Sequence, residues 1–273
     1  MVDLARNGFV PPFDAVAGDY DNSFGDSFCG RALRESVWLR LAPHLRAGMD
    51  VLDLGCGTGE DAIWLGRYGC NVLAVDNSSA MLQVAAAKIS RAGPTSNIRL
   101  RAFDFNGSDG ELGQAFEFVL SNFGAVNCVQ DLAALGQRLA RCLRPGGKAA
   151  IVFMGRFCVL ETLYYAGRFD AAAGRRWRGK AQAKVGDHVI DIRYFTVAEL
   201  RRAMPAFRAI GAYAIGVLLP PSYLFHLARR WPKLFATLAR WDRVVAGLWP
   251  LSRMGDHTLL LLERREDDGE QPA

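Results

Sequence analysis

The clearest chemical signature in the sequence is a glycine turn between a predicted strand and a predicted helix. The segment Val51-Leu52-Asp53-Leu54-Gly55-Cys56-Gly57-Thr58-Gly59 ends a short apolar run and precedes a helical pattern. Glycines at such a junction allow a tight turn and let the backbone approach a ligand closely. Asp76 ends the next apolar run, where a carboxylate can accept hydrogen bonds from both hydroxyls of a ribose. Together these features indicate a site for a nucleoside-containing cofactor at the carboxyl ends of the strands.

The spacing of this turn argues against a phosphate-bearing ligand. The pattern is GxGxG rather than GxGxxG, and Glu60 stands where the third glycine of a dinucleotide fingerprint would be, followed by Asp61. Carboxylates in the first turn of a helix would repel a pyrophosphate bound at that helix N-terminus. No Lys-Ser/Thr pair follows the glycines, which excludes a P-loop. A nucleoside cofactor without phosphate groups fits better.

The elements that must position this turn alternate between apolar runs and helical patterns. Strands are predicted over 49–55, 71–76, 97–105, 116–124 and 148–155, and helices over 60–69, 78–93 and 129–147. Strands that alternate with helices predict an α/β fold with a parallel sheet covered on both faces. Beyond residue 155 we expect a basic helical segment over 156–180, hairpin strand material over 185–196, a helix over 197–205, a strand over 207–219, a helical stretch over 222–249 and a strand over 256–265.

In order and spacing, these motifs resemble those of the class I, Rossmann-like S-adenosylmethionine-dependent methyltransferases. VLDLGCGTG is similar to the first motif of that family, VLAVDNSSAML (72–82) to the second, residues 102–105 to the third, and LRPGG (143–147) to the turn before the fifth strand. The resemblance covers roughly residues 13–155 and the last strand. It implies a doubly wound, mostly parallel seven-stranded sheet in the order 3-2-1-4-5-7-6, with the last strand antiparallel. It also implies S-adenosylmethionine as cofactor and S-adenosylhomocysteine as product.

The resemblance further implies which residues contact the cofactor. Gly55 and Gly57 would contact the methionine moiety, Asp76 the ribose, and Met81 and Phe105 the two faces of the adenine. The full implied set is Tyr20, Asp53, Gly55, Gly57, Asp76, Asn77, Met81, Asp104, Phe105 and Ser121. Arg31 or Arg34 could meet the methionine carboxylate, and the alternative is that both are plain surface arginines.

Candidate catalytic residues are fewer. Methyl transfer from a sulfonium requires an aligned nucleophile and exclusion of water, and a general base helps when the nucleophile is a hydroxyl or an acidic carbon. The candidates are His188 and His226, which lie in the regions expected to cover the substrate, and Asn122 in the loop after the fourth strand. No spacing matches a standard metal site, so no metal is expected. The loop SNFG (121–124) lacks the prolines typical of enzymes that methylate adenine N6 or glutamine, which argues against those substrates.

Substrate choice should lie in the segments added to the sheet. We expect one domain over 1–273, with an N-terminal helical lid over 1–48 and insertions over 156–196 and 220–253 that form a substrate cap. Apolar residues recur at helical spacing in the last insertion, at Leu234, Leu238, Trp241, Val245 and Leu248. This stripe fits a helix packed on its own domain, a lid over a hydrophobic substrate, or a helix of segment 222–249 lying on an anionic membrane.

Composition narrows the functional classes. Segments 156–180 and 222–253 carry net charges of +4 and +5, in a chain whose net charge is +5. The leading hypothesis is a methyltransferase for a small, apolar or aromatic molecule, because the insertions are rich in apolar and aromatic residues. The alternatives are an RNA methyltransferase, although no RNA-binding motif is visible and no nucleic-acid partner is expected, and a non-catalytic S-adenosylmethionine-binding protein. The six cysteines form no CxxC pair, and the N-terminus has no signal-peptide pattern, so we expect a cytoplasmic protein.

Overall fold

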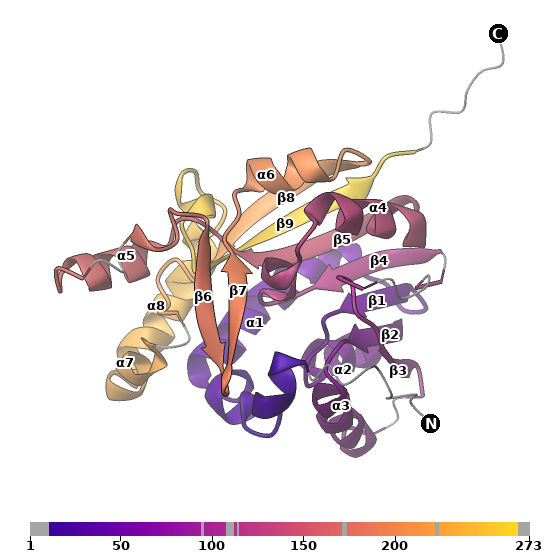
Figure 1. Cartoon of the computed structure of the whole chain (residues 1–273), viewed down its shortest axis with the longest axis horizontal. Coiled ribbons are helices and arrows are strands. Elements are labelled where there is room, and N and C mark those ends of the chain that lie inside the picture. The colour runs from indigo at the N-terminus through magenta and orange to yellow at the C-terminus, as the bar shows by residue number, and fades with distance from the viewer. Residues whose placement is uncertain are drawn as a thin grey trace, which may run out of the picture.

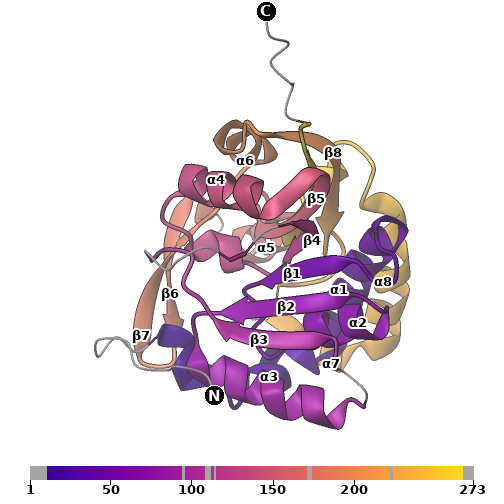
Figure 2. The ribbon, with the colours of Figure 1, turned by 90° about the vertical axis from the view of Figure 1, so that its right-hand side faces the viewer.

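A twisted seven-stranded sheet with helices on both faces forms the centre of the molecule (Figures 1 and 2). The computed structural model describes residues 11–93, 96–107, 112–113, 115–170, 174–221 and 224–266, without the side chains of 226, 227 and 229. The sheet strands are β1 (Asp50–Leu54), β2 (Asn71–Asp76), β3 (Ile98–Ala102), β4 (Phe116–Ser121), β5 (Leu143–Met154), β8 (Phe207–Ile215) and β9 (His257–Arg264).

The strand order in this sheet is β3-β2-β1-β4-β5-β9-β8. The first five strands pair in parallel, and β9 runs antiparallel to both β5 and β8. With β8 and β9 counted as its sixth and seventh strands, the predicted order 3-2-1-4-5-7-6 is confirmed.

The helices lie where the sequence predicts most of them. They are α1 (Phe28–Leu41), α2 (Glu60–Arg67), α3 (Ser79–Arg91), α4 (Leu132–Cys142), α5 (Val159–Ala166), α6 (Val197–Ala203), α7 (Phe225–Arg230) and α8 (Pro232–Val245), with the short turns η1 (Pro12–Val16), η2 (Asp21–Gly25), η3 (Ala42–His44), η4 (Ala125–Cys128) and η7 (Leu251–Arg253). Local capping sets several starts: the Ser78 side chain accepts a hydrogen bond from the Met81 N–H, and Thr196 and Glu199 form a capping box. Such caps satisfy amides that have no partner within the helix.

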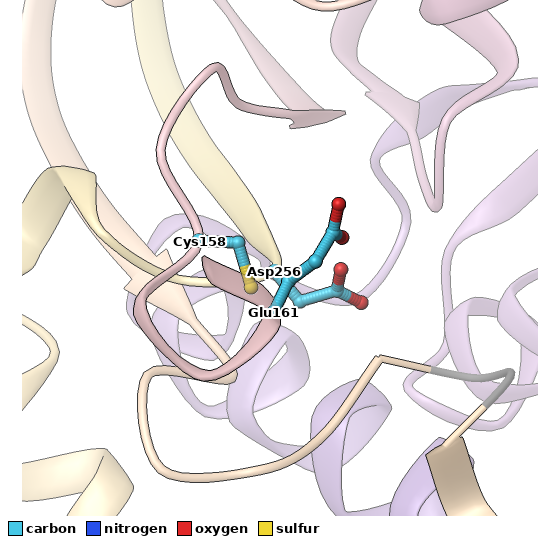
Figure 3. A group of neighbouring side chains, drawn as sticks. All are labelled: Cys158, Glu161 and Asp256. Atoms are coloured by element: carbon cyan, nitrogen blue, oxygen red, sulfur yellow. The ribbon is translucent and has the colours of Figure 1, made fainter. Parts of the chain in front are cut away.

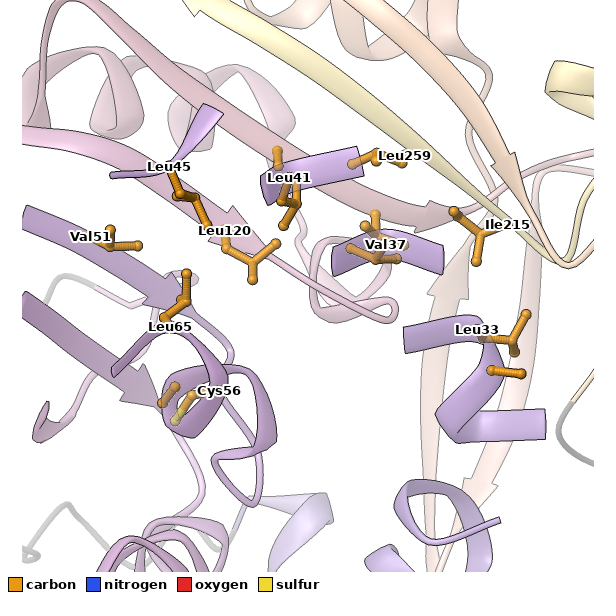
Figure 4. Close-up of a cluster of buried hydrophobic side chains, with 14 of the residues drawn as sticks. Leu33, Val37, Leu41, Leu45, Val51, Cys56, Leu65, Leu120, Ile215 and Leu259 are labelled. Carbon is orange, nitrogen blue, oxygen red and sulfur yellow. The ribbon is translucent and has the colours of Figure 1, made fainter. Parts of the chain in front are cut away.

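The alternation of side chains along the strands divides the core into two halves. Val51, Leu120 and Leu259 face the side covered by α1, α2, α7 and α8 (Figure 4). Their chain neighbours Leu52 and Leu260 face the side covered by α4 and α6. Because both faces are covered, the central strands β1, β4 and β9 are largely buried and apolar, which is why they are readable in the sequence as nearly continuous apolar runs.

The prediction of a basic helix over 156–180 is wrong for most of its length. Among the described residues of this segment, the α-helix is α5, which ends at Ala166 with Gly167 as its C-cap. Residues 180–185 form β6 (Lys180–Val185), which pairs with β7 (His188–Arg193) in a separate antiparallel hairpin. The sequence Lys-Ala-Gln-Ala-Lys-Val alternates with a period of two, which is typical of a strand, and its first residue, Lys180, is the last residue of the predicted basic helix. The start of β5 at Leu143 is also earlier than the predicted 148.

The β6–β7 hairpin lies next to the carboxyl ends of the parallel strands (Figure 1). At its turn, Gly186 has φ +58°, and a Cβ there would lie 2.7 Å from the Cβ of Ala15 in η1, so the turn packs closely on the N-terminal segment. At the other end of the hairpin, the buried Asn127 side chain donates to the carbonyls of Met154 and Arg193 over 3.1 and 2.5 Å. Asn127 thereby joins η4, β5 and β7 beside the site.

Candidate functional site

A cavity of about 290 Å³ lies at the carboxyl ends of the parallel strands, beneath the hairpin. Seven of the predicted cofactor contacts line it: Tyr20, Gly55, Gly57, Asp76, Asn77, Met81 and Phe105. These residues come from the N-terminal segment, the turn after β1, the end of β2, the start of α3 and the loop after β3. The fold therefore brings together groups that are far apart in the chain.

The glycine turn is fastened to Asp76. The Gly57 N–H donates to Oδ2 of Asp76 over 2.9 Å, and the Ser78 N–H donates to Oδ1 over 2.9 Å. Gly55 has φ +78°, and a Cβ there would lie 2.5 Å from the Cβ of Ala125. Gly57 has φ +51°, and a Cβ there would have nothing within 4 Å. Gly55 thus permits close packing against η4, and Gly57 leaves open space at the cavity.

Charge in this cavity favours a ligand without phosphates. Asp76 is the one charged side chain among its described lining residues. Burial raises the pKa of Asp76, and the amides of Ser78 and Gly57 partly oppose that shift. A pyrophosphate would meet a carboxylate and no lysine or arginine, whereas ribose hydroxyls are suitable donors to a carboxylate. The residues present therefore fit a phosphate-free nucleoside.

Three predicted contacts do not line the cavity. Asp53 is buried in β1, its Oδ2 has no hydrogen-bond partner, and burial and the charge of Asp61 raise its pKa. The Ser121 hydroxyl is buried without a partner at the end of β4. Asp104 accepts a hydrogen bond from the Asn106 N–H over 2.9 Å in the loop after β3. Contact of these three residues with a cofactor stays a prediction.

The N-terminal segment is tied to the glycine turn by Asp21. Its carboxylate accepts hydrogen bonds from the Thr58 hydroxyl over 2.7 Å and from the Lys88 ammonium over 2.8 Å. These bonds hold Tyr20 at the wall of the cavity, and burial raises the pKa of its phenol. Residues 1–10 of the predicted lid lie outside the described residues.

The two arginine candidates are bound elsewhere. Arg31 donates to the backbone carbonyl of Asp26, and the buried Arg34 pairs with Asp61. Asp61 also accepts hydrogen bonds from the Trp38 indole and from the side-chain amide of Asn122, over 2.7 and 3.1 Å. Asn122 lines the cavity, but Arg34 does not. Through Asn122, this network holds the loop after β4 in place.

Comparison with known proteins agrees with this geometry. A family model described as "Methyltransferase domain" matches residues 51–147, which span the glycine turn, Asp76 and the loop after β4. Residues 51–147 form a class I methyltransferase domain. The predicted family, whose cofactor is S-adenosylmethionine, is thereby confirmed for this part of the chain.

The relatives of the chain are similar over part of their length. A demethylmenaquinone methyltransferase of Clavibacter sepedonicus is 30% identical over 141 residues, which cover 51% of this chain and 55% of that protein. A ubiquinone biosynthesis O-methyltransferase of a Methylobacterium species is 27% identical over 70% of each chain. The solved structure of an S-adenosylmethionine-dependent methyltransferase from Mesorhizobium loti is 21% identical, with a TM-score of 0.55, over 84% of this chain and 98% of that one. The chain spans little more than half the length of the first of these relatives.

A second cavity of about 750 Å³ adjoins the first in this methyltransferase fold. The two cavities share four lining residues, namely Tyr20, Phe123, Met154 and Ile192. The rest of the second lining includes aromatic and basic side chains, namely Phe24, Tyr165, Tyr194, Arg175, Arg176 and Lys184, together with Asp256 and His257. It thus offers space for a second molecule beside the first cavity.

Among the three histidines whose side chains the structure describes, the one that reaches a cavity is not a predicted candidate. His188 is exposed at the start of β7 and lines neither cavity. His226 lies on α7, and its side chain is outside the described part of the structure. His257, at the start of β9, is buried, lines the second cavity and packs edge-on against Phe123 with ring centroids 5.3 Å apart. The signal in the sequence was the polar pair Asp256-His257 directly before the apolar run of the last strand.

Beside His257 lies a cluster of residue types that can bind metals. Cys158, Glu161 and Asp256 place their ligand atoms within 4.8 Å of one another (Figure 3). The buried Arg176 guanidinium donates to Glu161 over 2.6 Å and to Asp256 over 2.5 Å, and Arg175 donates to the other oxygen of Glu161 over 2.7 Å. Two guanidinium groups balance the two carboxylates, so this cluster is an ion-pair network.

Proposed function

We propose that this protein transfers a methyl group from S-adenosylmethionine to a small, largely apolar or aromatic molecule. The observation that carries this proposal is the pair of adjoining cavities: one has a single carboxylate at a glycine turn, and the other has an aromatic and basic lining. When bound, the cofactor supplies a methyl group on a positively charged sulfonium. The remaining task of the protein is to align the acceptor and exclude water.

The chain's own residues divide this task. In our proposal Asp76 accepts hydrogen bonds from the ribose hydroxyls, and Met81 and Phe105 flank the adenine. The backbone of Gly55 and Gly57 borders the methionine moiety. The N-terminal segment and the β6–β7 hairpin form the cap that excludes water, as the predicted domain organisation requires.

Several features support a small aromatic acceptor over RNA. Aromatic rings line the second cavity, and the relatives include enzymes named for demethylmenaquinone and for ubiquinone biosynthesis. Two of the basic residues in the lining, Arg175 and Arg176, are bound to Glu161 and Asp256, which lowers the positive charge available to an RNA backbone. A purely cofactor-binding protein would have no use for the second cavity.

The proposed function is tested in two steps. Calorimetry with S-adenosylhomocysteine should give saturable binding at one site, and absence of binding contradicts the proposal. Incubation with methyl-labelled S-adenosylmethionine and fractionated cell extract should then place label in small, solvent-extractable molecules. Label found only in RNA, with binding that weakens steeply as salt increases, would favour the RNA methyltransferase. Label found only in protein would also contradict the small-molecule proposal.

We also propose that this protein is cytoplasmic and docks on anionic membranes through α7 and α8. The predicted apolar stripe is largely on the surface: the exposed fractions of Leu234, Trp241 and Leu248 are 51, 58 and 55%. The same segment carries the exposed basic residues Arg230, Lys233, Arg240 and Arg253. The sole acidic residue between positions 225 and 253, Asp242, is fully buried. An apolar face with tryptophans and a basic border is typical of interfacial helices. Among the described residues, no helix is long and apolar enough to span a bilayer.

Vesicle sedimentation tests the docking proposal. The protein should bind vesicles rich in phosphatidylserine more tightly than pure phosphatidylcholine, since each basic residue near an anionic surface contributes about 1 kcal/mol. The double variant Trp241→Ser, Leu248→Ser should lose most of this binding. Trp177→Ser is the matched control, because Trp177 is 54% exposed outside α7 and α8. Equal binding by all three proteins would contradict the proposal.

A further inference from the structure

Next to His257, the side chains of Asp256, Arg176 and Glu161 are arranged as they would be to orient a general base. The Nδ1 atom of His257 lies 3.1 Å from Oδ2 of Asp256, and the other carboxylate oxygen, Oδ1, accepts a hydrogen bond from Arg176. Arg176 in turn is held by Glu161 and by the backbone carbonyl of Asp256, over 2.6 and 2.8 Å. All four of these residues are buried. The carboxylate of Asp256 therefore has one fixed orientation, with Oδ2 close to Nδ1 of His257, a buried nitrogen to which the structure gives no hydrogen-bond partner.

His257 also stands at the boundary between the two cavities. It is paired across the sheet with Met154, and its ring packs against Phe123. Met154 and Phe123 each line both cavities, and His257 lines the second. Since Nδ1 lies toward Asp256, Nε2 is the ring nitrogen left for a molecule in the second cavity.

The charges beside His257 are paired. The two arginines and two carboxylates of the cluster neutralise one another. Burial alone would raise the pKa of Asp256, but the neighbouring His257 and Arg176 outweigh this effect and hold the pKa well below its usual range. Asp256 thus stays a carboxylate that can stabilise an imidazolium. The titratable and charged groups around His257 are Asp256, Arg176, Arg175, Glu161, Cys158, Lys184, Tyr20, Tyr165 and Tyr194.

We propose that His257 is the general base of this protein, oriented by Asp256, and that the methyl acceptor is a hydroxyl group on an aromatic ring. This inference rests on the proposed function and specifies its acceptor. The hydroxyl oxygen forms a bond to the methyl carbon, and the bond from that carbon to sulfur breaks with its electron pair left on sulfur. The hydroxyl proton moves to Nε2 of His257 and is later released to water. A thiolate would not require a base at this position, and an acidic carbon, the other acceptor that a base would assist, would leave both phenols below without O-methylated product.

Turnover of two phenols separates a base from a structural role. Hydroquinone must lose a proton during the reaction, whereas 4-nitrophenol is largely ionised at slightly alkaline pH. For His257→Gln, we expect kcat with hydroquinone to fall by about 100- to 10,000-fold, and kcat with 4-nitrophenol to fall less than tenfold. His44→Gln is the control, since His44 lies in η3 and lines neither cavity. Equal losses with both phenols, or no loss, would overturn the role of His257.

A spectroscopic measurement provides a readout without turnover. With S-adenosylhomocysteine bound, 4-nitrophenol added to the wild-type protein at mildly acidic pH should show more of its yellow ionised form than it does in buffer. His257→Gln and Asp256→Asn should each reduce this excess at least threefold, while His44→Gln keeps it. Absence of the excess in the wild-type protein overturns the inference even if a variant fails to fold.

The two proposals fail differently. If S-adenosylhomocysteine does not bind, the proposed function fails. If it binds but the wild-type protein methylates neither phenol, the hydroxyl acceptor and the base are refuted, while the cofactor assignment stands.

Discussion

Replacing Asp76 tests the cofactor site most directly. Its two carboxylate oxygens accept hydrogen bonds from the amides of Gly57 and Ser78, and in our proposal they also accept the ribose hydroxyls. Asp76→Ala removes these charged acceptors, and a hydrogen bond to a charged group contributes about 1.5–3 kcal/mol. The dissociation constant for S-adenosylhomocysteine should therefore rise by about 10- to 150-fold. Asp76→Asn, which keeps one carbonyl acceptor, should give a smaller loss.

Calorimetry measures this change, with Asp50→Ala as the control. Asp50 begins β1 at the opposite end of the strands, and half of its side chain is exposed, so its loss should change affinity less than twofold. Because burial raises the pKa of Asp76, wild-type affinity should also start to fall, as pH decreases, at a higher pH than for an ordinary carboxylate. Affinity of Asp76→Ala within twofold of the wild type, in a folded protein, would refute the assignment.

Three further predictions concern stability. Since the pKa of Asp53 is raised in the fold, the native state binds its proton at a pH where the unfolded chain has released it. The free energy of unfolding of the wild-type protein should therefore fall, relative to that of Asp53→Asn, as pH rises above about 4. Urea denaturation of both proteins at several pH values measures this difference. A difference that does not change with pH would contradict the raised pKa of Asp53. Arg176→Met leaves the buried Asp256 without its arginine partner and should cost about 3–5 kcal/mol, whereas Arg175→Met, at a site one-third exposed, should cost about 1 kcal/mol or less. Equal costs in urea denaturation would contradict the ion-pair account. Asp242→Ala leaves two amides unpaired and should cost about 1–3 kcal/mol for each, with faster hydrogen exchange at the start of the loop after β8 as the check.

Local patterns predicted the part of the fold that positions the cofactor cavity. The strands before the glycine turn and before Asp76 are buried on both faces, so each is a continuous apolar run bounded by turn residues. Ser78 caps α3 as expected, because the cap depends on residues within one turn of one another. These features need no knowledge of distant contacts, and the same holds for the sheet order once the family resemblance is recognised.

The face on which α8 packs could not be predicted in this way. The sequence period selected Leu234, Trp241 and Leu248, yet the buried face is shifted by one residue and contains Phe235, Ala239, Asp242 and Ala246. Asp242 accounts for the shift, since its carboxylate accepts hydrogen bonds from the amides of Gly216 and Leu218, over 3.1 and 2.7 Å. A buried carboxylate at the centre of the packed face interrupts the apolar pattern. Its partners lie after another strand and are not visible from helical spacing.

His257 was missed for a topological reason that applies beyond this chain. Parallel strands bring their last residues to the site, so the sequence pattern points to the positions directly after each apolar run. An antiparallel strand brings its first residues to the same edge, as the pairing of His257 with Met154 shows. The polar pair before the last strand is therefore equivalent in position to Asp76 after β2 and to Asn122 after β4. Polar residues directly before an antiparallel strand are therefore candidates for the same site. They can be identified from the sequence once the direction of the last strand is known.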